Sequence, residues 1–175
     1  QLILGGRYTY DELEYHTSAD KTDGLIFPAP GEFSDSLDDS DFSPKVSLQW
    51  DFSDTSMVYG SYTSGYKGPA FDTTLLTGGS FVKPETSNAF ETGYKSRWFD
   101  NTLFLNVAFF YAEYQDYQAQ SAFDENPRDM IPGGLILINS GEVSTQGVEI
   151  EFLSQPLDNW TISGGVTYVD ATIED

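Results

Sequence analysis

The stretch SRWFDNTLFLNVAFFYAEYQDY, from Ser96 to Tyr117, decides the fold class. Its centre, Leu103 to Tyr111, is apolar except for Asn106, so its composition fits a buried helix, a membrane helix or a strand. The apolar run is far shorter than the roughly 20 residues that a membrane helix needs. It is rich in Phe, Tyr and Val and follows the turn dipeptide Asp100-Asn101, so a strand is favoured over a buried helix.

The same alternation of large apolar with small or polar residues recurs along the chain. Seven strands are predicted, at about residues 2–15, 42–52, 56–68, 84–99, 102–120, 135–154 and 160–174. In the sixth, Val148, Ile150 and Phe152 face one way and the intervening glutamates the other. No stretch shows a helical period. The sequence therefore predicts an all-β, antiparallel up-and-down meander.

The connections between the predicted strands alternate in length. Residues 53–55, 100–101 and 155–159 form tight turns, whereas residues 16–41, 69–83 and 121–134 form long loops that are polar or rich in Gly. In an up-and-down meander, all tight turns then lie at one end of the sheet and all long loops at the other. This asymmetry is typical of outer-membrane barrels, and it favours a section of a large transmembrane β-barrel over a soluble β-sandwich.

The aromatic residues gather at the two ends of the predicted strands. Trp50, Trp98 and Trp160 each lie close to a tight turn, and we predict that they mark one membrane interface, because amphipathic aromatics concentrate there. Tyrosines cluster toward the other strand ends: Tyr8, Tyr10, Tyr62, Tyr66, Tyr114 and Tyr117. The segments 102–120 and 135–154 exceed the roughly 9 to 11 residues of a β crossing, so their distal ends are expected to project beyond the membrane.

Composition excludes several classes of function. The chain has 175 residues, no Cys and a formal net charge of −20. Disulfides and thiolate metal sites are therefore excluded, and only 8 Lys and Arg are present to neutralise nucleic-acid phosphates. Residues 1–4 show neither an initiator Met nor the features of a signal peptide, so we expect an internal piece or a processed form.

Three segments carry a family resemblance. They are PKVSLQWDFSDTSMVYGSYTSGYKGPAFD (44–72), KPETSNAFETGYKSRWFDNTLFLNVAFFYAEYQDYQAQ (83–120) and NSGEVSTQGVEIEF (139–152). In this order and spacing they resemble the C-terminal barrel of TonB-dependent outer-membrane receptors of the siderophore type. The resemblance implies a bacterial outer-membrane barrel of about 22 strands, plugged by a separate N-terminal domain. Residues 1–175 would then be part of the barrel, without the plug and short of a complete barrel.

Candidate ligand-binding residues flank two of the long loops. Tyr66, Lys67 and Phe71 lead into one loop, and Tyr114, Tyr117 and Phe123 lead into another. Aromatic and hydrogen-bonding groups at a barrel mouth would suit a hydrophobic chelate. The alternative is that the tyrosines belong to the outer aromatic girdle. A further set is expected to face the lumen, where the plug would contact it: Glu91, Lys95, Arg97, Glu149 and Glu151.

Catalytic and metal sites find little support. The single histidine, His16, has no identifiable nucleophile partner, and no phosphate, dinucleotide or zinc motif appears. The acidic run Asp35, Asp38, Asp39 and Asp41 has Ca²⁺-binding oxygens without the EF-hand spacing, so a solvated loop is the alternative. We therefore expect no enzyme activity, no catalytic residue, no metal site and no cofactor.

The functional hypothesis is energy-coupled uptake of a scarce ligand. The resemblance implies outer-membrane lipid around the barrel, contact with the TonB complex through the N-terminal part, and an iron chelate as cargo. A ferric siderophore is the commonest cargo among the receptors that the chain resembles, although haem, cobalamin and carbohydrate receptors share the quoted features. The acidic loops favour a neutral or cationic ligand. The rival hypotheses are a passive outer-membrane porin and a soluble, secreted all-β binding module.

Overall fold

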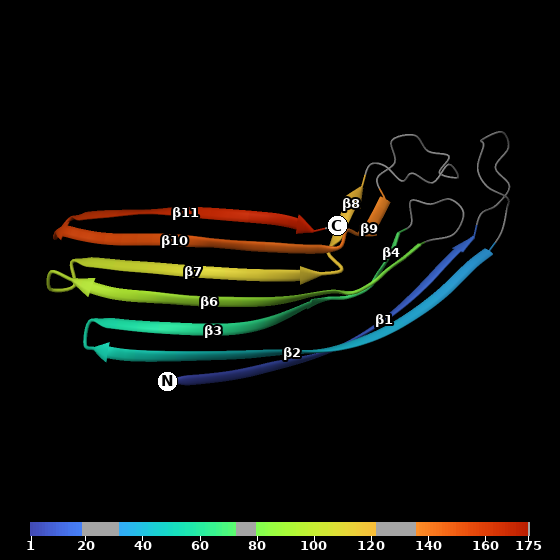
Figure 1. The fold of residues 1–175 in the computed structure, drawn as a ribbon, viewed down its shortest axis with the longest axis horizontal. Coiled ribbons are helices and arrows are strands. Elements are labelled where there is room, and N and C mark those ends of the chain that lie inside the picture. The colour runs from blue at the N-terminus through green and yellow to red at the C-terminus, as the bar shows by residue number, and fades with distance from the viewer. Residues whose placement is uncertain (19–31, 73–79, 122–135, 175) are drawn as a thin grey trace.

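The computed structural model describes residues 1–18, 32–72, 80–121 and 136–174. Seven long strands form one antiparallel sheet in the order β1-β2-β3-β6-β7-β10-β11, so each pairs with the next long strand along the chain. Their bounds are β1 Leu2–Ser18, β2 Glu32–Ser53, β3 Ser56–Lys67, β6 Glu85–Trp98, β7 Leu103–Gln115, β10 Glu142–Leu157 and β11 Trp160–Glu174. The predicted meander of seven strands is confirmed (Figure 1).

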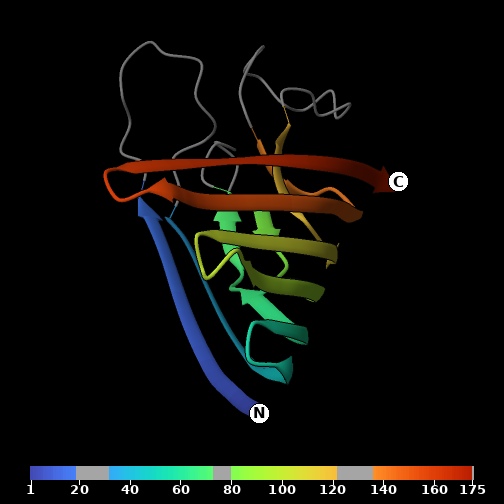
Figure 2. The same ribbon diagram turned by 90° about the vertical axis from the view of Figure 1, so that its left-hand side faces the viewer.

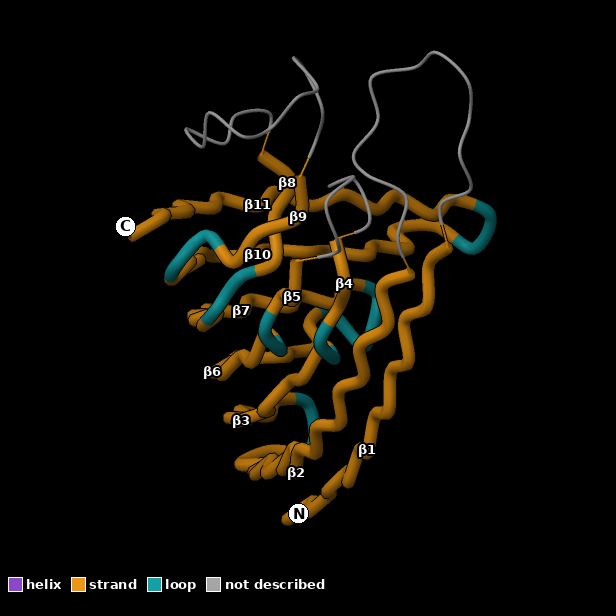
Figure 3. Tube along the Cα trace, turned by 90° about the vertical axis from the view of Figure 1, so that its right-hand side faces the viewer, coloured by secondary structure: helices purple, strands orange, loops and turns teal. Residues whose placement is uncertain are grey.

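Two short hairpins, called the outer hairpins below, extend from one end of this sheet. β4 (Ala70–Asp72) pairs with β5 (Ser80–Val82), and β8 (Gln118–Ser121) pairs with β9 (Ile136–Asn139). The tight turns lie at the opposite end, as the alternation of loop lengths predicts (Figure 1). The seven-stranded sheet curves from β1 to β11 (Figures 2 and 3).

The register between strands gives the sheet two distinct faces. Cross-strand partners point to the same side of a sheet. One row across the sheet joins Leu48, Gly60, Thr92, Phe109 and Val148, and large apolar side chains dominate this apolar face. A row on the other face, nearer the tight turns, joins Asp51, Met57, Lys95, Asn106 and Glu151. We call this second side the polar face, although Phe104, Phe110 and Leu153 also lie on it.

The described parts of the predicted loop 16–41, residues 16–18 and 32–41, are strand. β1 continues to Ser18, β2 begins at Glu32, and the two remain paired from Leu2–Leu48 to Ser18–Glu32. Pairing of β2 with β3 ends at Lys45–Thr63, so the outer half of the β1–β2 hairpin leaves the sheet (Figure 1). His16 and the acidic run therefore lie on paired strands, because pairing with the Tyr-rich outer half of β1 overrides their loop-like composition.

Two predicted strands are interrupted. The segment 102–120 breaks after Gln115, where Asp116 has a φ of 50°, and 135–154 breaks at Gly141, where φ is 78°. Both residues adopt left-handed backbone, which ends a strand. The distal pieces pair with each other as β8 and β9 and leave the main sheet.

The tight turns differ slightly from their predicted bounds. The turn after β6 places Phe99, Asp100 and Asn101 at positive φ, and the Thr102 N–H donates to the Phe99 carbonyl over 3.1 Å. The turn predicted at 155–159 is shorter, since β10 continues to Leu157 through an irregularity after Ser154. Within the described ranges, no helix is long and apolar enough to cross a membrane.

Candidate functional site: the polar face and the outer hairpins

The described part of the chain has almost no apolar core. Val82 and Ala108 are its only buried hydrophobic residues, at 1% and 6% exposure. By contrast, the three tryptophans are 49% to 65% exposed, and they all stand near the tight-turn end of the apolar face. A soluble sandwich would cover such a face with a second sheet, and the seven-stranded sheet has none among the described residues.

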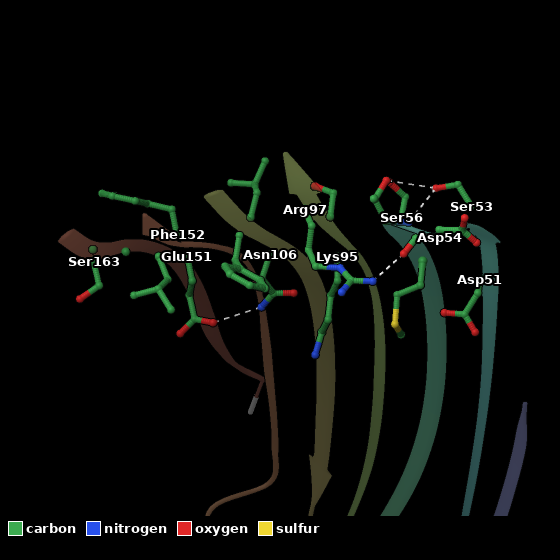
Figure 4. Close-up of a pocket in the computed structure, with 18 residues that line it drawn as sticks. Asp51, Ser53, Asp54, Ser56, Lys95, Arg97, Asn106, Glu151, Phe152 and Ser163 are labelled. Atoms are coloured by element: carbon green, nitrogen blue, oxygen red, sulfur yellow. Dashed lines mark hydrogen bonds between the residues drawn. The ribbon is translucent and has the colours of Figure 1, made fainter. Parts of the chain in front are cut away.

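A cavity of about 710 Å³ lies at the tight-turn end of the sheet and is lined in part by the polar face. Lys95, Arg97, Asn106 and Glu151 line it from three neighbouring strands (Figure 4). The Asn106 amide donates to Glu151 Oε2 over 3.1 Å, and Arg97 Nη2 donates to the Asp54 carbonyl over 2.5 Å. The wall therefore carries both cationic and anionic side chains, with Asn106 between Lys95 and Glu151.

Tyr59 contacts two charged side chains on the polar face. Its hydroxyl donates to Glu91 Oε1 over 2.6 Å, and Lys95 Nζ stands 5.2 Å from the ring centroid. The residues predicted to face the lumen do share one face: Glu91, Lys95, Arg97, Glu149 and Glu151. Strand parity was sufficient to place all five, because no bulge interrupts the pairing of β6, β7 and β10 at these residues.

The structure ties Tyr66 and Lys67 to neighbouring strands. The Tyr66 hydroxyl donates to Asp39 Oδ2 over 2.7 Å, and Arg7 donates to the Tyr66 carbonyl over 3.3 Å. Lys67 Nζ lies 3.7 Å from Glu85 Oε2. The Tyr66 side chain bridges the point where β1–β2 diverges from β3, whereas Lys67 pairs with its directly opposed residue on β6.

The other described candidates lie at or near the two short hairpins: Phe71 in β4, Tyr114 at the end of β7 and Tyr117 just before β8. Phe71 stacks on Tyr15, with ring centroids 5.4 Å apart, and also meets Phe81 edge to face at 6.3 Å. Tyr114 and Tyr117 pack edge to face, with centroids 6.0 Å apart. Phe123 lies outside the described residues. Sequence reasoning missed Asp72, Gln118 and Asn139, which join the two hairpins through hydrogen bonds.

The acidic run does not assemble a metal site in the described ranges. Asp39 lies opposite Asp11, and Asp38 lies opposite Glu12, but no group of three or more His, Cys, Asp or Glu there is placed to hold a metal ion. His16 pairs with Ser34 on the adjacent strand. These residues instead give the outer half of β1–β2 a negative surface.

The comparison with protein families decides the assignment. The model of the family described as "TonB dependent receptor-like, beta-barrel" matches residues 1–175. The chain belongs to the TonB-dependent receptor family. This family consists of transport receptors rather than enzymes.

Solved structures with this fold include receptors for ferric complexes and a copper transporter. The ferric yersiniabactin uptake receptor FyuA from Yersinia pestis matches at 21% identity and a TM-score of 0.68, over 98% of this chain and 24% of that one. The siderophore receptor PiuA from Acinetobacter baumannii matches at 22% and 0.63, over 98% and 23%. The copper transporter OprC matches at 15% and 0.73, over 98% and 27%. The chain thus spans about a quarter of the length of each.

Proposed function

We propose that residues 1–175 form a section of the barrel wall of a bacterial outer-membrane receptor that takes up a ferric siderophore with energy from the TonB complex. The observation that carries this proposal is the family match over the whole chain. The ferric yersiniabactin uptake receptor FyuA of Yersinia pestis and the siderophore receptor PiuA of Acinetobacter baumannii share this fold and support the choice of cargo. No covalent chemistry is required of the wall.

The two faces of the sheet suit this role. The exposed apolar face would contact outer-membrane lipid, with Trp50, Trp98 and Trp160 at the interface on the tight-turn side. The polar face would contact the plug domain of the complete receptor through Glu91, Lys95, Arg97, Glu149 and Glu151. The TonB complex would act through the plug rather than through these strands.

The outer hairpins would receive the ligand. The candidates remain Tyr66, Lys67, Phe71, Tyr114, Tyr117 and Phe123. The rings of Tyr114 and Tyr117 pack against each other. Opposed acidic pairs on the outer half of β1–β2 give this side a negative field, which favours neutral or cationic chelates over anionic ones.

Uptake by cells that lack and regain the complete receptor tests the proposal. Cells would be given radioactive iron as catecholate, hydroxamate or carboxylate siderophore complexes. Free Cu²⁺ would be a further cargo, because the copper transporter OprC shares this fold. We expect saturable uptake of one ferric complex, abolished by deletion of TonB. Uptake that persists without TonB would indicate a passive porin, and uptake of Cu²⁺ alone would overturn the siderophore assignment.

A further inference from the structure

The two outer hairpins meet at a junction that is unusually buried for this chain. Val82 is 1% exposed, Asp72 5% and Gln118 7%. Buried polar side chains are almost always hydrogen-bonded, because an unpaired one costs its full desolvation free energy. The partners of Asp72 and Gln118 therefore show what holds the junction together.

Two carboxamide side chains hold the backbone of Lys83. Gln118 and Asn139 lie opposite each other on β8 and β9. Asn139 Oδ1 accepts from the Lys83 N–H over 2.9 Å, and its Nδ2 donates to the Lys83 and Asp116 carbonyls over 3.1 and 2.7 Å. Gln118 Nε2 donates to the Lys83 and Gly68 carbonyls over 2.9 and 2.8 Å. The side chain of Asn139 thus pairs with Lys83 as a neighbouring strand would.

Further bonds run across the same junction. Asp72 Oδ2, from β4, accepts from the Leu137 N–H of β9 over 2.8 Å. Glu85 Oε2, from β6, accepts from the Gln118 N–H over 2.8 Å, and the Lys83 ammonium lies 3.5 Å from Asp116 Oδ1. Each hairpin therefore uses side chains to hold backbone groups of the other, and the connection is reciprocal.

We propose that this junction is a clamp that couples β4–β5 to β8–β9, so that the two hairpins unfold locally and refold as one unit. In this clamp Asp72, Gln118 and Asn139 act as positioning residues. Asp72 follows Phe71, and Gln118 follows Tyr117. These two candidate ligand-binding aromatics are therefore chain neighbours of buried clamp residues. Adjacent residues of a strand point to opposite sides, so burial of Asp72 leaves Phe71 facing Tyr15. The consequence for ligand binding rests on the proposed function, whereas the clamp itself does not.

Hydrogen exchange of backbone amides in the complete receptor, held in lipid nanodiscs, tests the clamp. In Asp72→Ala the Leu137 amide loses its acceptor directly, so the reporters are the Lys83 and Gln118 amides, whose own acceptors are intact. We expect exchange at all three amides to be at least about tenfold faster than in the unsubstituted receptor, because local unfolding of one hairpin would unfold the other. Asp72→Asn keeps an acceptor oxygen and should restore slow exchange. Gln120→Ala, at an exposed position of β8, should change nothing.

Two outcomes separate the clamp from a set of independent contacts. Faster exchange at Leu137 alone would show that the hairpins open independently and would overturn the proposal. If Asp72→Ala fails to insert, Asn139→Ala gives the reverse test. Its reporter is the Leu137 amide, whose acceptor Asp72 on β4 is unchanged, and Val148 of β10 is the check that the main sheet is intact. Neither result depends on the cargo, so failure of the siderophore assignment leaves this test unaffected.

Discussion

The ring of Tyr59 lies across Gly93, its directly opposed partner on β6, so closely that a Cβ atom at residue 93 would meet ring carbons at 2.5 Å. The hydrogen bond to Glu91 and the ammonium of Lys95 hold the ring in that place. Glycine is therefore required at residue 93 by close approach of a neighbouring side chain, since its backbone φ is not positive.

Gly93→Ala should destabilise the barrel, because the added methyl group forces the Tyr59 ring away from Glu91. Loss of that hydrogen bond costs about 0.5 to 1.5 kcal/mol. The free energy of unfolding in urea, measured on the complete receptor in lipid vesicles, gives the value. Gly60→Ala is the matched control, because its Cβ would meet only the Glu91 carbonyl at 3.9 Å.

A double-mutant cycle identifies the cause of that loss. In a Tyr59→Ser background the methyl group added at residue 93 has room, so Gly93→Ala should become nearly neutral. An unchanged loss in this background would show that the ring is not the obstacle.

Glu12→Lys should stabilise the outer half of the β1–β2 hairpin. Glu12 lies opposite Asp38, and like charges in opposed positions of a sheet are unfavourable by roughly 0.2 to 1 kcal/mol. Slower hydrogen exchange of the Asp38 and Ser40 amides at low salt would measure the gain, and added salt should reduce it. Glu14→Lys is the control, since Glu14 faces Ser36; an equal gain there would point to net charge rather than the opposed pair.

The sequence predicts the main sheet well because its signals are local. Period-two alternation, the turn at Asp100-Asn101 and the alternating loop lengths all concern neighbouring residues. The outer half of β2 escapes prediction because SDSLDDSD has the composition of a loop, and it is a strand only through pairing with residues 9–16 of β1. The breaks in the strands at Asp116 and Gly141 likewise escape prediction, because they depend on the pairing of β8 with β9, which are far apart in the sequence.

The candidate functional site likewise has a part that local sequence signals predict and a part that they do not. Strand parity places Glu91, Lys95 and Glu151 on one face, as predicted. The clamp could not be foreseen, because Gln118 and Asn139 bind a backbone group 35 and 56 residues away in the chain. Only the fold brings these carboxamides to Lys83.

The three tryptophans should lie at one depth in the bilayer. In variants of the complete receptor that retain only Trp50, Trp98 or Trp160, lipids brominated near the headgroup should quench fluorescence most strongly, and to a similar extent for each. The physical reason is that amphipathic indole rings prefer the interface. Strong quenching of any one by bromines near the bilayer centre would contradict a common girdle at this end.

Tyr117→Ala should weaken binding of the ferric chelate that the uptake assay identifies, by about tenfold if the ring stacks on it. Isothermal titration of the complete receptor measures the dissociation constant. Gln120→Ala, on the exposed side of β8, should leave it unchanged. Equal affinity in both variants would assign Tyr117 to the aromatic girdle instead.

The three tight turns also bear on the order in which the sheet forms. They join β2 to β3, β6 to β7 and β10 to β11, so these pairs need to close only a few residues, whereas the other neighbours are joined through residues 19–31, 68–84 and 116–141. The entropy lost on closing a loop grows with its length. The sheet is therefore expected to assemble from three early hairpins, whose docking completes the outer loops last.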